Sequence, residues 1–354
     1  PMKGETAPLQ AGWKHIVDSA EQHNDPGVFT AFIGYEWTSV PQGNNLHRNV
    51  IFRGGRGGAE QVLPYTNYES DDAEDLWRWM ANYEKKTGDQ VLAIPHNGNL
   101  SNGLMFDDVS YTERKPLDKD YAEQRQRWEP LYEVTQMKGD GESHPLLSPN
   151  DEFADYETWD LGNLDMSAVK SPAMIKGEYA REALKQGLAY QAEYGVNPYE
   201  FGLIGSTDSH TSLAAVEENN FFGKHTGYEP GPERLSHPFM KNENGELFSW
   251  QQVASGLTGV WAAENTREAI FDAMHRREVY ATTGTRLAVR FFGGWEYTEK
   301  DIQSREPAFA GYAKGVPMGG DLTAAPKGKA PNFMVYALRD SMGANLDRIQ
   351  IVKG

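Results

Sequence analysis

Phe-Gly-Leu-Ile-Gly-Ser-Thr-Asp-Ser-His, residues 201–210, is the stretch that decides how this chain of 354 residues is interpreted. An apolar run ends at Gly205, and the polar residues that follow include Asp208 and His210. This pattern predicts a buried strand that delivers a carboxylate and an imidazole to its carboxyl end, where the loops of α/β proteins gather and bind ligands. Side chains two apart in an extended chain point the same way, so both can reach one metal ion or one water molecule. An exposed turn capped by Asp208 would give the same local pattern.

Three more apolar runs upstream carry residues of the same kind. Each is short, β-branched or aromatic, and bounded by turn residues, which predicts a buried strand. The runs and their candidate ligands are residues 28–37 with Glu36, residues 90–97 with His96, and residues 131–136 with Glu133.

Helix-like segments alternate with these strands. They cover residues 70–88, 119–129 and 174–194, and a fourth begins near Asn265 and leads into a strand at 279–282. Such alternation predicts parallel strands with crossover helices, either as a barrel or as an open doubly wound sheet. We prefer an α/β barrel because ligand-type residues at several strand ends have to converge on one mouth.

The last seventy residues have a different pattern. Gly and Pro are frequent after Gly284, and short alternating runs occur at 286–292, 332–338 and 348–352. This pattern predicts antiparallel β structure. We therefore expect a barrel over residues 1–284 and a β-rich C-terminal domain over residues 285–354.

Composition excludes several classes of protein. An apolar content of 39% with 24% charged residues is typical of globular proteins. A formal charge of −17 disfavours nucleic acid as a partner, and no run of eighteen apolar residues predicts a membrane span. The absence of cysteine excludes disulfides, thiolate nucleophiles and Cys-type zinc sites, but it does not decide between cytoplasm and periplasm.

The candidate ligands form an oxygen and nitrogen set without sulfur. Such a set suits Mn²⁺, Zn²⁺ or Fe²⁺. Five ligands exceed the needs of one catalytic zinc, so we expect two or three ions bridged by a carboxylate. His47, eleven residues after Glu36, is a sixth candidate, either as a ligand or as a substrate contact. The five are Glu36, His96, Glu133, Asp208 and His210.

Weaker candidates for substrate binding follow from position alone. Arg48 and Lys138 lie next to predicted strands and are expected to contact an anion. His144 lies in the long polar loop 142–152, which either contacts substrate or is a structured surface loop.

These residues together resemble the polymerase-and-histidinol-phosphatase (PHP) superfamily of metal-dependent hydrolases. Longer motifs resemble the bacterial PHP-like family of unknown function that carries the number 3604. The resemblance implies a distorted (β/α)₇ barrel that binds up to three metal ions. The motifs that carry it are Asn44–Arg48, Ile94–Asn99, Ser148–Phe153 and Tyr280–Gly284.

One departure from the superfamily pattern affects the expected site. The superfamily opens with a His-x-His strand and a nearby acid, and neither occurs here before Glu36. The resemblance therefore implies that the first strands of the barrel are missing and that an N-terminal segment of the same protein is a partner of this chain.

The leading functional hypothesis is a metal-dependent hydrolase of a small anionic substrate, a phosphoesterase in which a metal-bound hydroxide attacks. Asp208, His210 and His47 are the expected catalytic residues. One alternative is hydrolysis of another ester or of a C–N bond by the same metal cluster. Another is a non-catalytic carbohydrate- or polymer-binding protein that uses its nine Trp and seventeen Tyr, although core packing is the commoner fate of such residues.

Overall fold

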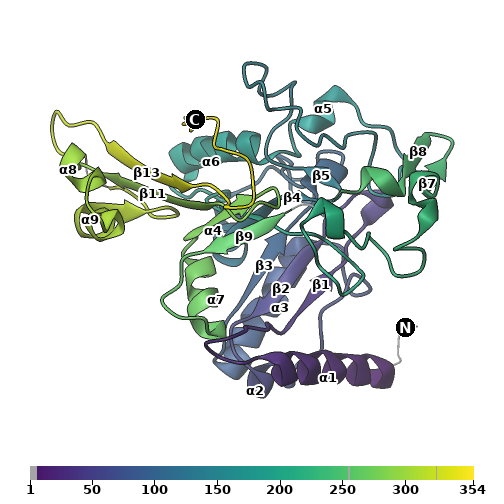
Figure 1. The fold of residues 1–354 in the computed structure, drawn as a ribbon. Helices are drawn as coiled ribbons and strands as arrows, with labels where there is room; N and C mark the ends of the chain where they lie inside the picture. Colours follow the sequence, from purple (N-terminus) through teal and green to yellow (C-terminus); the bar gives the residue numbers. More distant parts are fainter. Residues whose placement is uncertain (1–5, 254–255, 324) are drawn as a thin grey trace.

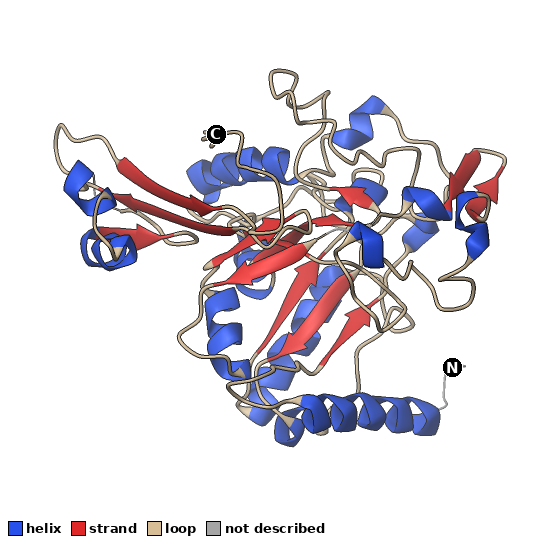
Figure 2. Cartoon of the chain, in the orientation of Figure 1, coloured by secondary structure: helices blue, strands red, loops and turns tan. Residues whose placement is uncertain are grey.

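A computed structural model describes residues 6–253, 256–323 and 325–354 of the chain (Figure 1). Helices and strands alternate through most of it, with long loops between several of them (Figure 2). The helices are α1 (Thr6–His23), α2 (Arg56–Ala59), α3 (Ala73–Thr87), α4 (Lys119–Trp128), α5 (Pro172–Ile175), α6 (Ala180–Tyr194), α7 (Arg267–His275), α8 (Glu299–Ile302) and α9 (Pro307–Lys314). The strands are β1 (Gly34–Trp37), β2 (Arg48–Phe52), β3 (Val91–Pro95), β4 (Leu131–Gln136), β5 (Gly139–Asp140), β6 (Gly202–Gly205), β7 (Pro238–Asn242), β8 (Gly245–Phe248), β9 (Leu257–Val260), β10 (Val279–Thr282), β11 (Ala288–Gly294), β12 (Gly315–Pro317) and β13 (Asn332–Leu338).

The central strands form three small sheets rather than one parallel barrel. β1, β2 and β3 are antiparallel neighbours, β4 pairs in parallel with β6 and antiparallel with β5, and β10 pairs antiparallel with β9. The expected α/β class is confirmed, but the ranges that the structure describes contain no closed barrel. The expected parallel order fails first at β2. A short connection after β1 reverses the chain there, whereas a parallel neighbour needs a crossover of a dozen residues or more.

Apolar side chains from helices pack against the central strands in two core clusters. On one side α1 and α3 pack against β1 and β2 in a core that includes Trp13, Trp77 and Phe52. On the other side α7 packs against β3, β4 and β6 through Phe271 and Met274. Figure 1 shows α1 crossing beneath the first three strands.

The helix expected over residues 70–88 is α3, and sequence features close to it account for its position. α3 buries Leu76, Trp77, Met80 and Tyr83, the spacing of one helix face. Gly88 ends it in the left-handed conformation, as expected. Its N-cap is Asp72, whose side chain accepts a hydrogen bond from the backbone N–H of Glu74 at 3.0 Å.

The residues from 285 are rich in β structure. β11 lies between β12 and β13 in an antiparallel sheet, which extends away from the other strands in Figure 1. Two short helices, α8 and α9, accompany it. The strand expected at 348–352 is wrong, because these residues are exposed and adopt no regular structure. The separate domain boundary at 285 stays a prediction. None of the helices within the described ranges combines the length and the apolarity that crossing a bilayer requires.

Candidate metal centre

Strand register brings together three side chains that are distant in sequence. β1 and β3 run in the same direction, with β2 antiparallel between them. The first residue of β2, Arg48, pairs with the last residue of β1 on one side and the last residue of β3 on the other. His47 just before β2 and His96 just after β3 therefore lie at one edge of the sheet, beside Glu36.

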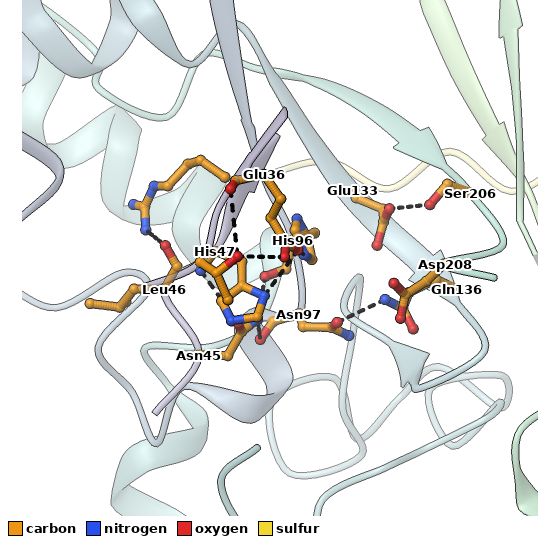
Figure 3. Close-up of polar contacts among 12 residues, drawn as sticks. Glu36, Asn45, Leu46, His47, His96, Asn97, Glu133, Gln136, Ser206 and Asp208 are labelled. Carbon is orange, nitrogen blue, oxygen red and sulfur yellow. Dashed lines mark hydrogen bonds and ion pairs between the residues drawn. The ribbon is translucent and has the colours of Figure 1, made fainter. Parts of the chain in front are cut away.

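Glu36 and the two histidines form a compact set of ligand atoms (Figure 3). The Oε1 atom of Glu36 lies 3.1 Å from Nδ1 of His47 and 3.0 Å from Nε2 of His96. One ligand atom from each residue lies within 4.8 Å of the others. The His96 side chain is 4% exposed and that of His47 is 12% exposed, whereas that of Glu36 is 33% exposed. The set is thus buried on the histidine side and open to solvent on the carboxylate side.

Two further carboxylates from the predicted set lie on the next strands. Glu133 in β4 accepts a hydrogen bond from the hydroxyl of Ser206, which follows β6. Asp208 forms ion pairs with both Lys138 and Lys224. Figure 3 shows Glu133 and Asp208 on the side of the site away from Glu36. The charge of Glu133 and that of Asp208 both act on His96, so the two groups of side chains belong to one electrostatic site.

Three buried polar atoms at this site have no hydrogen-bond partner in the part of the chain that the structure describes. They are Nε2 of His47, Nδ1 of His96 and Oε1 of Glu133. Buried polar atoms of this kind are rare in folded proteins and call for a ligand, an ion or a water molecule. A carboxylate with two imidazoles is also a donor set that Zn²⁺ and related divalent ions use. The residues present therefore fit a divalent cation.

The pKa of each group in the triad reflects burial and its neighbours. Burial would raise the pKa of Glu36, but hydrogen bonds from His47 and His96 and their charges hold that pKa far below its usual range. Burial lowers the pKa of His47 against the opposing effect of Glu36. For His96 burial also acts downward, but the hydrogen bond to Glu36 and the charge of Glu133 raise the pKa overall.

The second group of side chains is shifted by burial and by its lysines. Burial raises the pKa of Glu133. For Asp208 burial acts upward, but Lys138 and Lys224 hold the pKa of this carboxyl well below its usual range. Burial and the nearby charge of Lys138 lower the pKa of Lys224 to about 7.

A hydrogen-bond network holds the turn that presents His96. The side-chain amide of Asn45 donates to the carbonyl oxygens of His96, at 2.8 Å, and of Asn97, at 3.1 Å. Asn97 has a φ of 51°, in the left-handed region that asparagine tolerates better than most residues. Gln136 donates to its side-chain oxygen at 2.7 Å (Figure 3). The amide contacts thus position the imidazole at the end of β3.

His210 lies at the rim of the site and apart from the triad. Its Nδ1 atom is 2.9 Å from the backbone oxygen of Asp208 and 2.8 Å from Nζ of Lys224. The side chain is 49% exposed. It lies beside His225, whose ring centre is 5.0 Å away. His210 is therefore placed to meet a molecule that enters from solvent.

Two of the expected substrate contacts, Arg48 and His144, pair with carboxylates of the protein itself. Arg48 is 2% exposed, and its Nε atom donates to Glu129 at 3.0 Å in a buried ion pair. His144 is also buried, with Nε2 lying 3.0 Å from Asp160. Both side chains are thus held by partners within the protein, and the expected contact of Arg48 with an anion and of His144 with substrate stays a prediction. Lys138, by contrast, lies at the site through its ion pair with Asp208.

Lys224 is the site residue that the sequence pattern did not indicate. It lies in an irregular loop, and its ammonium reaches Asp208 only through the tertiary fold. The sequence pattern could have indicated Ser206, because this residue belongs to the run 201–210 that ends in Asp208 and His210. The tryptophans considered for carbohydrate binding mostly pack inside: Trp77 and Trp128 are buried, and Trp79 packs against the same core.

Comparisons with known proteins found one family and two relatives. The profile of a family described as "protein of unknown function (DUF3604)" matches residues 2–354. An uncharacterized protein of Chlamydia trachomatis is 32% identical over 109 residues, which cover 30% of this chain and 16% of the relative. An uncharacterized protein of Chlamydia muridarum has the same identity and coverage. The match thus spans less than a fifth of the length of these relatives. No solved structure matches the chain.

These findings correct the resemblance drawn from the sequence motifs. The expected family number, 3604, is the one that matches. The link to the PHP superfamily is wrong on these findings, because the matching family is described only as of unknown function and no comparison connects it to that superfamily. Fold and function therefore have to be argued from this chain's own residues.

Proposed function

From its membership of the DUF3604 family, whose function is unknown, and from the geometry of its candidate metal centre, we propose that this chain is a metal-dependent hydrolase of an anionic ester, most simply a phosphoester. The observation that carries the proposal is the convergence of Glu36, His47 and His96 within 4.8 Å at a buried sheet edge. The buried, unpartnered atoms of the two imidazoles and of Glu133 support it.

The triad supplies the first cation position. A carboxylate and two imidazoles leave coordination positions free, which is what distinguishes a catalytic site from a closed structural one. A bound divalent cation supplies Lewis acidity and makes a coordinated water molecule acidic enough to react near neutral pH. The partial exposure of Glu36 gives that position access to solvent.

Glu133 and Asp208 are the carboxylates available to a second ion. Glu133 has one free buried oxygen, and Asp208 is held by two lysines that a cation would have to displace in part. His210 is then the group at the rim that can exchange a proton with the leaving group, since it is exposed and hydrogen-bonded to the Asp208 backbone.

Charge at the site favours an anionic substrate. Glu36, Glu133 and Asp208 supply three carboxylates, and Lys138 and Lys224 supply two ammonium groups. When all five groups are charged, the site has a negative net charge, and one bound divalent cation makes that net charge positive. Buried ammonium groups beside such a cation attract and orient a phosphate group. Phosphoester hydrolysis therefore uses the whole site, whereas a neutral ester or amide would give the lysines no substrate charge to bind.

The test combines metal content with turnover. The chain is purified, stripped with a chelator and reloaded with Mn²⁺ or Zn²⁺, and bound metal is measured by elemental analysis alongside hydrolysis of 4-nitrophenyl phosphate. His96→Ala should lose metal and activity together, whereas the matched control His15→Ala, on the exposed face of α1, should retain both. Equal metal content and turnover in wild type and His96→Ala would overturn the proposal. Turnover of carboxylic esters or amides alone would favour the same centre with a different substrate.

A non-catalytic carbohydrate-binding protein is the alternative from another class. It predicts no metal requirement and sugar binding that survives removal of the triad. The burial of Trp77 and Trp128 in the core removes two of the aromatic side chains that such a protein would need on its surface.

A further inference from the structure

A cavity of about 460 Å³ lies directly against two carboxylates of the candidate metal centre. Glu36 and Glu133 line one end of it. The remaining wall includes the apolar side chains of Phe32, Ile51, Ile94 and Ile204, together with the polar side chains of Asn49, Ser206 and Thr258. Its size and its apolar side chains with a few convergent polar groups are typical of a small-molecule site.

Strand alternation explains why part of the wall is apolar. Phe32, Gly34 and Glu36 are two apart in the chain around β1, so they face the same side of the sheet. Gly34 pairs with Ile51 in β2, which faces that side as well. This face of the sheet thus carries the side chains of Phe32 and Ile51 next to Glu36, the carboxylate of the candidate metal centre.

Helix α7 covers part of this face of the sheet. Its Phe271 and Met274 pack with Ile94 and Ile204 in one core cluster, while Phe32 and Ile51 lie at the edge of that cluster and remain partly exposed. Partly exposed apolar side chains next to a polar reaction centre are what an apolar ligand group would cover.

Two glycines that line the cavity allow neighbouring strands to approach closely. A side chain at Gly34 would begin 2.8 Å from the carbonyl oxygen of Val50, and one at Gly205 would begin 2.8 Å from that of Leu257. Both strands therefore present bare backbone beside the carboxylates, and both glycines line the cavity. A larger residue at either position would displace a strand or narrow the space.

We propose that this cavity holds an apolar organic group of the substrate, so that the enzyme hydrolyses aryl or branched alkyl phosphate esters in preference to small polar ones. This inference rests on the proposed function, since it assumes that the phosphate meets the metal centre. The cavity adjoins Glu36 and Glu133, so a group attached to a phosphate at that centre can enter it without moving a strand.

The experiment compares two stable analogues that differ only in the apolar group. Binding of phenylphosphonate and of methylphosphonate to the Mn²⁺-loaded protein is measured by calorimetry. Burial of a phenyl group should tighten binding by about tenfold or more. Ile51→Trp, which fills the cavity, should abolish that preference, while Phe32→Ala should weaken it. Ile16→Trp, a matched change on the exposed side of α1, should leave it intact.

The outcomes separate this inference from the hydrolase proposal. Equal affinity for the two phosphonates, binding of neither, or a phenyl preference that survives in folded Ile51→Trp would overturn the cavity assignment. Hydrolysis of phosphate esters could still be observed in each of those cases and would leave the hydrolase proposal in place. Conversely, a phenyl preference that Ile51→Trp removes, with no turnover of any ester, would support the cavity assignment and overturn the hydrolase. Should Ile51→Trp fail to fold, the wild-type comparison and Phe32→Ala decide the question.

Discussion

The carboxylate of Glu36, at the end of β1, lies 3.0 Å from the imidazole of His96, just after β3. Neither residue is near the other in sequence, and no strand pairing joins β1 to β3, because β2 lies between them. The contact exists because β1 and β3 run in the same direction and end at the same edge. This relationship is the basis of the proposed metal centre.

We predict that Asp208 is required for stability as well as for the site. Asp208→Asn leaves Lys138 and Lys224 without their shared carboxylate, and both ammonium groups are buried. Breaking a buried ion pair by removing one partner costs about 3–5 kcal/mol. Urea unfolding in the presence of a chelator should show a loss of this order. A loss below about 1 kcal/mol would contradict the ion-pair geometry.

Arg48 provides a test of a structural role against substrate binding. Arg48→Met removes one of the two guanidinium groups that pair with the buried carboxylate of Glu129, the other belonging to Arg125. We expect the free energy of unfolding to fall by about 3 kcal/mol. The KM for an aryl phosphate, measured on the folded variant, should stay within about twofold of wild type, since the guanidinium of Arg48 is held by Glu129 and by the carbonyl oxygen of Leu46. A large rise in KM with unchanged stability would support the anion-binding role.

His210 should affect turnover without affecting metal content. His210→Gln keeps a polar side chain at the rim but removes the imidazole, which can both take up and release a proton. Loss of general acid catalysis should lower kcat by about 100-fold or more, with little change in bound Mn²⁺. His47→Gln, by contrast, should lower bound metal. Loss of metal in both variants to the same extent would mean that His210 is a ligand, as the sequence pattern suggested.

The pH dependence of stability should contain a contribution from Asp140. Burial raises the pKa of this carboxyl to about 7, against hydrogen bonds from the backbone N–H groups of Ser143 and Glu142. Because the folded pKa lies above the unfolded value, the contribution is full below pH 3.8 and is lost as the pH rises through 7. Asp140→Asn should therefore flatten the fall in unfolding free energy between pH 4 and pH 7.

The control for that measurement is Asp155→Asn, at an exposed position in the loop after β5. It should leave the slope of stability against pH unchanged. The Asp140→Asn variant also loses one acceptor for a backbone N–H, which shifts stability at every pH but not its slope. An unchanged slope in Asp140→Asn would show that Asp140 ionises at its ordinary pKa.

Local signals in the sequence were sufficient for several elements. The spacing of Leu76, Trp77, Met80 and Tyr83, with Gly88 after them, predicted α3, and the β-branched run 131–136 predicted β4 with its ends correct. Glu36 and His96 were candidates from their positions at the ends of apolar runs, and His47 was a further candidate eleven residues after Glu36; the structure brings the three together. These features depend on residues close together in the chain.

Features that depend on distant contacts were not predicted. Apolar runs do not encode strand direction, so the reversal at β2 and the open arrangement of sheets were missed. The helix α1 was missed because its residues carry no acidic first turn and few buried positions. The ion pairs of Lys224 with Asp208 and of Arg48 with Glu129 join residues whose proximity only the tertiary fold creates.

The central claim is that Glu36, His47 and His96 bind a metal ion, and anomalous diffraction from crystals grown with Zn²⁺ tests it most directly. We predict a strong anomalous peak between the Glu36 carboxylate and the rings of His47 and His96, about 2.0–2.2 Å from a ligand atom of each residue. The peak should disappear in Glu36→Gln and persist in His15→Ala. A zinc-loaded crystal in which all three side chains are ordered and no peak lies among them would contradict the account.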